Sequence, residues 1–173
     1  MPCQFSEMVL GSSAIFSPDH RYISVVSGSR LTVRETDTVE ILHVFSCVDK
    51  IEKVVFSPDS QYILCGMFSR NAIQIFSIAD GEWRCRINEG VAGIIQASWG
   101  PDSRCIITES DFGLQLGVWN LTDSSSLTIP SPKANLKTSP SILLDSSPCL
   151  ANKTSRLSGF SDCGRYFAIV QRI

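Results

Sequence analysis

The chain has 173 residues, of which 43% are hydrophobic and 18% are charged, as in a folded globular protein. Fifteen Lys and Arg residues oppose 17 Asp and Glu residues, so the formal net charge is −2. Without a strong positive field the chain lacks the usual driving force for binding nucleic acid. We therefore expect no nucleic-acid partner.

The seven cysteines contain no Cys-x-x-Cys pair, and His20 and His43 do not lie near them at the spacing of zinc ligands. We expect no metal, no cofactor, and free thiols in a reducing cytosol. No apolar run approaches the roughly 20 residues that span a bilayer, and the first residues lack the pattern of a secretory signal. The sequence thus predicts a cytoplasmic protein with no membrane partner.

A short motif recurs along the chain: an aromatic residue, Ser or Gly, then Pro and Asp. It begins at Phe16, Phe56 and Trp99, and a weakened copy begins at Phe160. The intervals are 40, 43 and 61 residues. Each motif predicts a tight turn between two strands, because Pro presets φ and Asp bonds the nearby backbone. A period just above 40 residues is typical of β-propeller blades.

A second set of anchors supports this period. Alternating runs begin at Leu31, Ile73 and Leu116, at intervals of 42 and 43 residues, and each is typical of a strand. In the second and third repeats the strand before the run, at 62–65 and 105–107, is nearly continuously apolar, which predicts sheets buried on both faces by stacking. A single β-sandwich also explains the alternation and the turns, but not the aligned anchors. In the second repeat, strands are predicted over 51–56, 62–67, 72–77 and about 83–87.

We therefore expect an all-β fold, a partial β-propeller with three four-stranded blades and half of a fourth in an open ring. The expected divisions are an N-terminal strand over 1–11 that would close the last blade of a full ring, blade 1 over 12–46, blade 2 over 47–89, blade 3 over 90–130, a flexible Ser/Thr/Pro-rich insert over 122–155 that overlaps the end of blade 3, and a partial blade 4 over 156–173.

The repeats resemble the WD-repeat superfamily, although the signature is degraded and the usual Gly-His pair is missing. The superfamily's buried network of His, Asp, Ser and Trp is not expected to assemble here, and Asp111 is the one plausible remnant. At the Trp-Asp position the chain reads Arg34-Glu35, Phe76-Ser77 and Trp119-Asn120.

Residues 30–34, 82–85 and 89–93 resemble the N-terminal part of the WRAP-type antisense WD-repeat family of centrosomes and spindle poles. This resemblance covers 5–137 and resumes at Leu157. It implies a scaffold without catalytic activity, which helps to anchor microtubule minus ends through a coiled-coil partner at spindle poles, centriolar satellites or, in plants, cortical sites. Family members are longer, so we expect a truncated product.

Other functions remain open. They are a generic adaptor such as a ubiquitin-ligase substrate receptor, an RNA-binding WD protein, and a truncated product without independent function. Pull-down of ligase subunits would favour the first, and salt-dependent RNA binding the second.

No enzyme motif is present. No nucleophile is placed beside either histidine, and no glycine-rich phosphate loop occurs, so we expect no catalytic residue, no cofactor-binding residue and no small-molecule substrate. Propellers carry function on their loops, where Arg and aromatic residues favour protein contacts. The candidate partner-binding residues are Asp49, Lys50, Arg70, Asp111 and Phe112, and the candidate phosphorylation sites, each followed by proline, are Ser131, Ser139 and Ser147.

Overall fold

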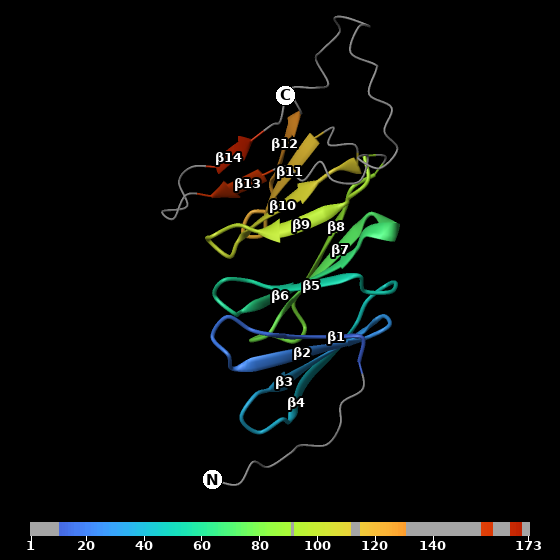
Figure 1. The fold of residues 1–173 in the computed structure, drawn as a ribbon, viewed down its shortest axis with the longest axis vertical. Helices are drawn as coiled ribbons and strands as arrows, with labels where there is room; N and C mark the ends of the chain where they lie inside the picture. Colours follow the sequence, from blue (N-terminus) through green and yellow to red (C-terminus); the bar gives the residue numbers. More distant parts are fainter. Residues whose placement is uncertain (1–10, 91, 112–114, 131–156, 161–166, 171–173) are drawn as a thin grey trace, which may run out of the picture.

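Three four-stranded antiparallel sheets follow one another along the chain, and each pairs its strands in sequence order. The structure is a computed structural model that describes residues 11–90, 92–111, 115–130, 157–160 and 167–170. Figure 1 shows the sheets stacked along the long axis, from the first (blue) through the second (green) to the third (yellow). This confirms the expected fold class, an all-β partial propeller with an open ring.

The strands of the second repeat begin close to where the sequence predicts them. The strands expected over 62–67 and 72–77 are confirmed. The strand expected over 51–56 begins later, at Lys53, because the backbone N–H of Ile51 donates to the carbonyl of Gly28, next to the first sheet.

The first sheet holds β1 (Ser13–Phe16), β2 (Tyr22–Ser27), β3 (Arg30–Glu35) and β4 (Ile41–Ser46). The second holds β5 (Lys53–Phe56), β6 (Tyr62–Met67), β7 (Ala72–Ser77) and β8 (Arg84–Asn88), with the 3-10 turn η1 (Phe68–Arg70) between β6 and β7. The third holds β9 (Gln96–Trp99), β10 (Cys105–Glu109), β11 (Gln115–Asn120) and β12 (Ser126–Pro130), and β13 (Leu157–Phe160) pairs with β14 (Phe167–Val170).

The recurring Ser-Pro-Asp motif forms the turn between the first two strands of a sheet, as expected. The Ser57 hydroxyl donates to Asp59 Oδ1 at 2.6 Å and accepts from the Tyr62 N–H at 2.9 Å. The first repeat has the same two bonds, at 2.6 and 3.0 Å. In the third repeat glycine replaces serine, and the N–H of Cys105 donates directly to the carboxylate of Asp102 at 2.9 Å. The aspartate therefore holds the turn even without the hydroxyl.

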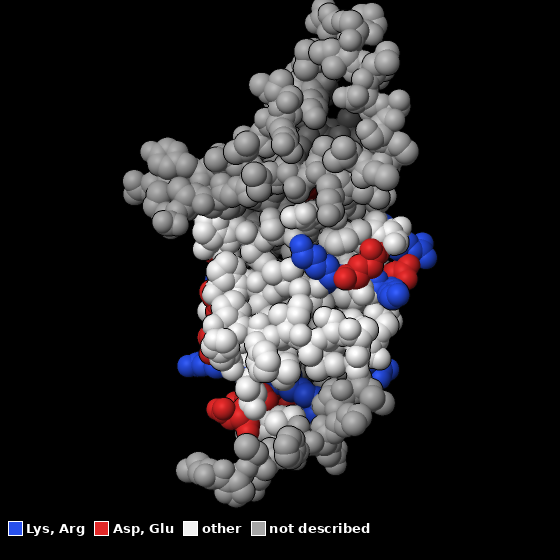
Figure 2. Space-filling model, in the orientation of Figure 1, with Lys and Arg blue, Asp and Glu red and all other residues white. Residues whose placement is uncertain are grey.

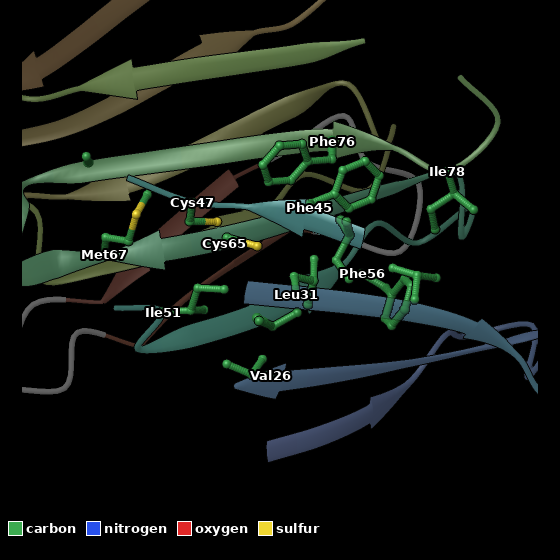
Figure 3. Close-up of a cluster of buried hydrophobic side chains, with 14 residues drawn as sticks. Val26, Leu31, Phe45, Cys47, Ile51, Phe56, Cys65, Met67, Phe76 and Ile78 are labelled. Carbon is green, nitrogen blue, oxygen red and sulfur yellow. The ribbon is translucent and has the colours of Figure 1, made fainter. Parts of the chain in front are cut away.

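The second sheet is buried on both faces, which confirms the expected stacking. Successive side chains of β6 point to opposite faces, so Ile63 and Cys65 pack toward the first sheet while Leu64 packs toward the third. Figure 3 shows the first of these two clusters, which lies between the first and second sheets. Burying one such side chain stabilises the fold by roughly 1.5–3 kcal/mol.

Several sequence expectations lie outside the described residues, namely the N-terminal strand up to Leu10 and the part of the insert after Pro130. The first part of the 122–155 segment contains β12, which pairs with β11 through Leu127 and Val118. Among the described residues, no helix is long and apolar enough to cross a membrane.

Candidate partner-binding face

Two kinds of connection meet at one end of the sheets: the links between successive sheets and the loops between second and third strands. The Cys47 N–H donates to the Ser29 carbonyl at 2.8 Å, and the Glu89 N–H donates to the Asn71 carbonyl at 3.1 Å. The Asp111 N–H donates to the Ala92 carbonyl at 3.1 Å. We call this end the loop rim and define it as residues 28–29, 47–52, 68–71, 88–90, 92–95 and 110–111.

The rim brings three of the predicted site residues together. Asp49 and Lys50 lie on the link between β4 and β5, and Arg70 ends η1. The Arg70 Nε donates to Asp49 Oδ2 at 2.6 Å. This bond, with a second from the Lys50 N–H, lowers the pKa of Asp49 below its ordinary value, so the carboxylate is charged at neutral pH.

A hollow of 410 Å³ opens beside this ion pair. Glu52 and Ser69 contribute to its wall, and the Ser69 N–H donates to Glu52 Oε1 at 2.8 Å, which ties η1 to the link. Figure 2 shows charged side chains of both signs gathered on the side of the molecule where Figure 1 draws η1. The hollow therefore has charged side chains of both signs on its wall, within reach of a partner. Its lining residues are Asp49, Lys50, Glu52, Met67, Ser69 and Arg70.

Asp111 lies further along the rim, at the junction between the second and third sheets. Asp111 packs closely against Gly93, which has a φ of +68°: a Cβ added to this glycine would lie 3.5 Å from the Cβ of Asp111. Asn71, also left-handed with φ 51°, accepts a hydrogen bond from the Ile94 N–H at 3.2 Å. Asp111 thus shares the rim with Arg70 but lies at a different junction.

The remaining predicted site residues, Phe112, Ser131, Ser139 and Ser147, lie outside the described residues. For these four, and for the residues placed on the rim, a role in binding or modification stays a prediction.

The sequence did not predict a side-chain network at the third sheet, in which Thr108 is buried and Trp119 and Glu89 are half-buried. The Trp119 Nε1 donates to Thr108 Oγ1 at 3.1 Å, and the Thr108 hydroxyl donates to Glu89 Oε1 at 3.1 Å. A Cβ on Gly117 would stand 2.5 Å from Thr108 Oγ1, so glycine leaves the space that the network needs.

This network is not the superfamily's set of His, Asp, Ser and Trp, which the sequence was not expected to assemble. Its members are Glu89, Thr108 and Trp119. Glu89 lies on the link between the second and third sheets and provides the acceptor, so an acidic residue on that link paired with Trp119 would have been the signal in the sequence.

The two histidines have structural surroundings. The His43 Nε2 is 2.8 Å from the carbonyl oxygen of Ile78, and its ring stacks on Phe45 at 5.3 Å between centroids. His20 is exposed at the left-handed position of a turn, with φ 61°. Within the part of the chain that the structure describes, no three His, Cys, Asp or Glu side chains are grouped to hold a metal ion.

Comparison with known proteins relates this geometry to one curated relative and to several solved folds. No family model matches the chain. It is 35% identical over 157 residues to the mouse WD repeat-containing protein WRAP73, an alignment that covers 91% of this chain. The chain spans only 30% of that relative's length.

Solved structures resemble it in fold alone. U3-55K and the WD40 repeats of RRP9 each match with a TM-score of 0.56 at 15% identity, over 68% of this chain and 38% of theirs. A eukaryotic initiation factor matches with a TM-score of 0.58 at 16% identity, over 69% of this chain and 32% of its own.

Proposed function

We propose, from the premise that this chain belongs to the WD-repeat superfamily, that it is a non-enzymatic scaffold for protein partners. Its proposed role is to help anchor microtubule minus ends through a coiled-coil partner. It acts in the cytoplasm, at centrosomes or spindle poles, or at cortical microtubule sites in a plant. The observation that carries this proposal is the 35% identity to the mouse relative across 91% of the chain.

The loop rim supports a role in protein binding. Its connections are held by rigid sheets, so the side chains that they present pay little ordering entropy on binding. Asp49 and Arg70 offer both charges side by side, and the flanks of coiled coils carry Glu and Lys that can meet them. Such contacts steer association and weaken with salt.

The test is localisation and co-purification of the full chain, tagged, in dividing cells. We expect the wild-type chain to concentrate at spindle poles and to co-purify with a coiled-coil microtubule-anchoring protein. Recovery of that protein should fall several-fold for Arg70→Asp and for Asp49→Arg. Arg84→Ala, which removes an exposed arginine at the opposite end of β8 from the rim, is the matched control and should bind normally.

The double variant Asp49→Arg with Arg70→Asp rebuilds the ion pair with its charges exchanged. If the partner recognises the individual charges, binding stays weak in the double variant. If the pair serves only to hold the link against η1, binding returns. Diffuse localisation of the wild-type chain with recovery of ubiquitin-ligase subunits would instead support a generic adaptor and overturn the proposal.

A further inference from the structure

Two free cysteines meet in the core between the first and second sheets. Cys47 directly follows β4, and Cys65 lies in the middle of β6. Both belong to one buried cluster, with exposed fractions of 9% and 0%. Figure 3 shows the two side chains next to each other, Cys47 just after the first sheet ends and Cys65 within the second. The two cysteines are far apart in the sequence, but the stacking of the first and second sheets brings their side chains into one cluster.

The repeat explains why these two positions meet. The Cys47 N–H bonds the Ser29 carbonyl just as the Glu89 N–H bonds the Asn71 carbonyl at the next junction. Cys65 pairs across its sheet with Val54, and Thr108 pairs with Ala97 in the same way. Cys47 and Cys65 therefore occupy the places of Glu89 and Thr108, whose side chains bond each other at 3.1 Å.

The surroundings assign different roles to the two thiols. Interaction with the Cys65 thiol lowers the pKa of Cys47, whereas Cys47 and burial together raise the pKa of Cys65. Cys47 is thus the thiol that ionises first, and with an exposed fraction of 9% against 0% it is the more accessible of the two. Thiolate is the reactive form of cysteine.

We propose that Cys47 and Cys65 form a reversible disulfide site that locks the first sheet to the second when a hydroperoxide is present. The Cys47 thiolate attacks one peroxide oxygen; the O–O bond breaks, the leaving oxygen takes a proton to give water or an alcohol, and Cys47 becomes a sulfenic acid. The Cys65 sulfur then attacks the Cys47 sulfur, the S–S bond forms, and water leaves with the Cys65 proton. Two thiols supply the two electrons that reduce the peroxide. This inference does not rest on the proposed function.

The test uses the purified full chain, reduced and then treated with hydrogen peroxide. After free thiols are alkylated under denaturing conditions, mass spectrometry should find Cys47 and Cys65 protected and their peptides linked, and dithiothreitol should reverse both. The oxidised chain should unfold at a higher urea concentration than the reduced chain, because the bond closes a loop in the unfolded state.

Two variants control the result. Cys65→Val keeps an apolar side chain in the cluster, so it should fold, yet peroxide should no longer raise its urea midpoint. Cys85→Ser, at a half-buried position of β8, should keep both the linked peptide and the shift in midpoint. The proposal is overturned if Cys47 and Cys65 remain alkylatable while Cys85 or Cys105 is oxidised, or if the linked chain unfolds at the same midpoint as the reduced one.

Discussion

The two junctions between sheets join equivalent elements by different chemistry. The first is mainly apolar: Phe45 stacks on Phe76 with ring centroids 4.4 Å apart, and the two buried cysteines lie beside them. The second also buries an apolar cluster, which includes Leu64, Ile94 and Ile106, and adds directional bonds from side chains of the third repeat to the second. These are Arg104 to Asp59 at 2.8 Å, Trp99 Nε1 to the Val55 carbonyl at 3.0 Å, and Thr108 to Glu89 at 3.1 Å.

Both junctions nevertheless share one hydrogen bond, from a backbone N–H to a serine hydroxyl. The Asp19 N–H donates to Ser60 Oγ at 3.1 Å, and the Asp59 N–H donates to Ser103 Oγ at 3.0 Å. The two junctions therefore keep this hydrogen bond although their other side chains differ. Apolar burial is non-directional and insensitive to pH, whereas the polar junction depends on the charge and the angle of its partners.

The largest effect should come from the apolar junction. Phe76→Ala removes a buried ring that packs on Phe45, and we expect it to lower the free energy of unfolding by about 3–5 kcal/mol in urea titrations. Phe16→Ala is the control, because Phe16 is a phenylalanine of the first sheet that is 54% exposed and so has little burial to lose. Equal losses for the two variants would show that stacking on a neighbouring sheet does not stabilise the fold.

A smaller loss is expected in the polar junction. Thr108→Val keeps the shape but deletes the hydroxyl, which leaves Trp119 Nε1 and Glu89 without their partner and should cost about 1–3 kcal/mol in the same titration. Cys65→Val, at the equivalent position of the apolar junction, should cost less, since it replaces one small apolar side chain with another. If Cys65→Val lowers the free energy of unfolding as much as Thr108→Val does, then side-chain hydrogen bonds do not distinguish the second junction from the first.

Acid should weaken the polar junction. Burial tends to raise the pKa of Asp59, but hydrogen bonds from Ser57 and Gln61 and the Arg104 guanidinium lower it below its ordinary value. Because the folded pKa lies below the unfolded one, the stability that Asp59 contributes is present above the unfolded pKa, near 3.9, and is lost as pH falls through the folded value. The urea midpoint should therefore fall between pH 5 and about pH 2, and less steeply in Asp59→Asn. An unchanged slope in Asp59→Asn would refute this assignment.

The smallest effect is expected on the loop rim. Arg70 and Asp49 are exposed, and an exposed ion pair contributes little to stability. Arg70→Ala should leave the urea midpoint unchanged within error while it reduces partner recovery. A clear drop in midpoint would instead make the pair part of the fold.

The sequence predicted the repeat and the turns because their signals are local. Ser57, Asp59 and Tyr62 lie within one turn, and their bonds are formed almost entirely inside that segment. The link residue Asp49 and the loop residue Arg70 could be proposed as surface positions for the same reason. Their ion pair could not, because it joins segments 21 positions apart through the path of two strands.

The period, the strand alternation and the all-β class follow from the amino-acid order alone, since each depends on how apolar and turn-forming residues succeed one another along the chain. Which positions face one another across a junction depends instead on the angle and register of the stacked sheets, so it is known only from the fold. Cys47 thus meets Cys65 where Glu89 meets Thr108 one repeat later, and Phe56 is 5% exposed while its counterpart Phe16 is 54% exposed. The same position along a strand is core or surface according to whether a neighbouring sheet covers it.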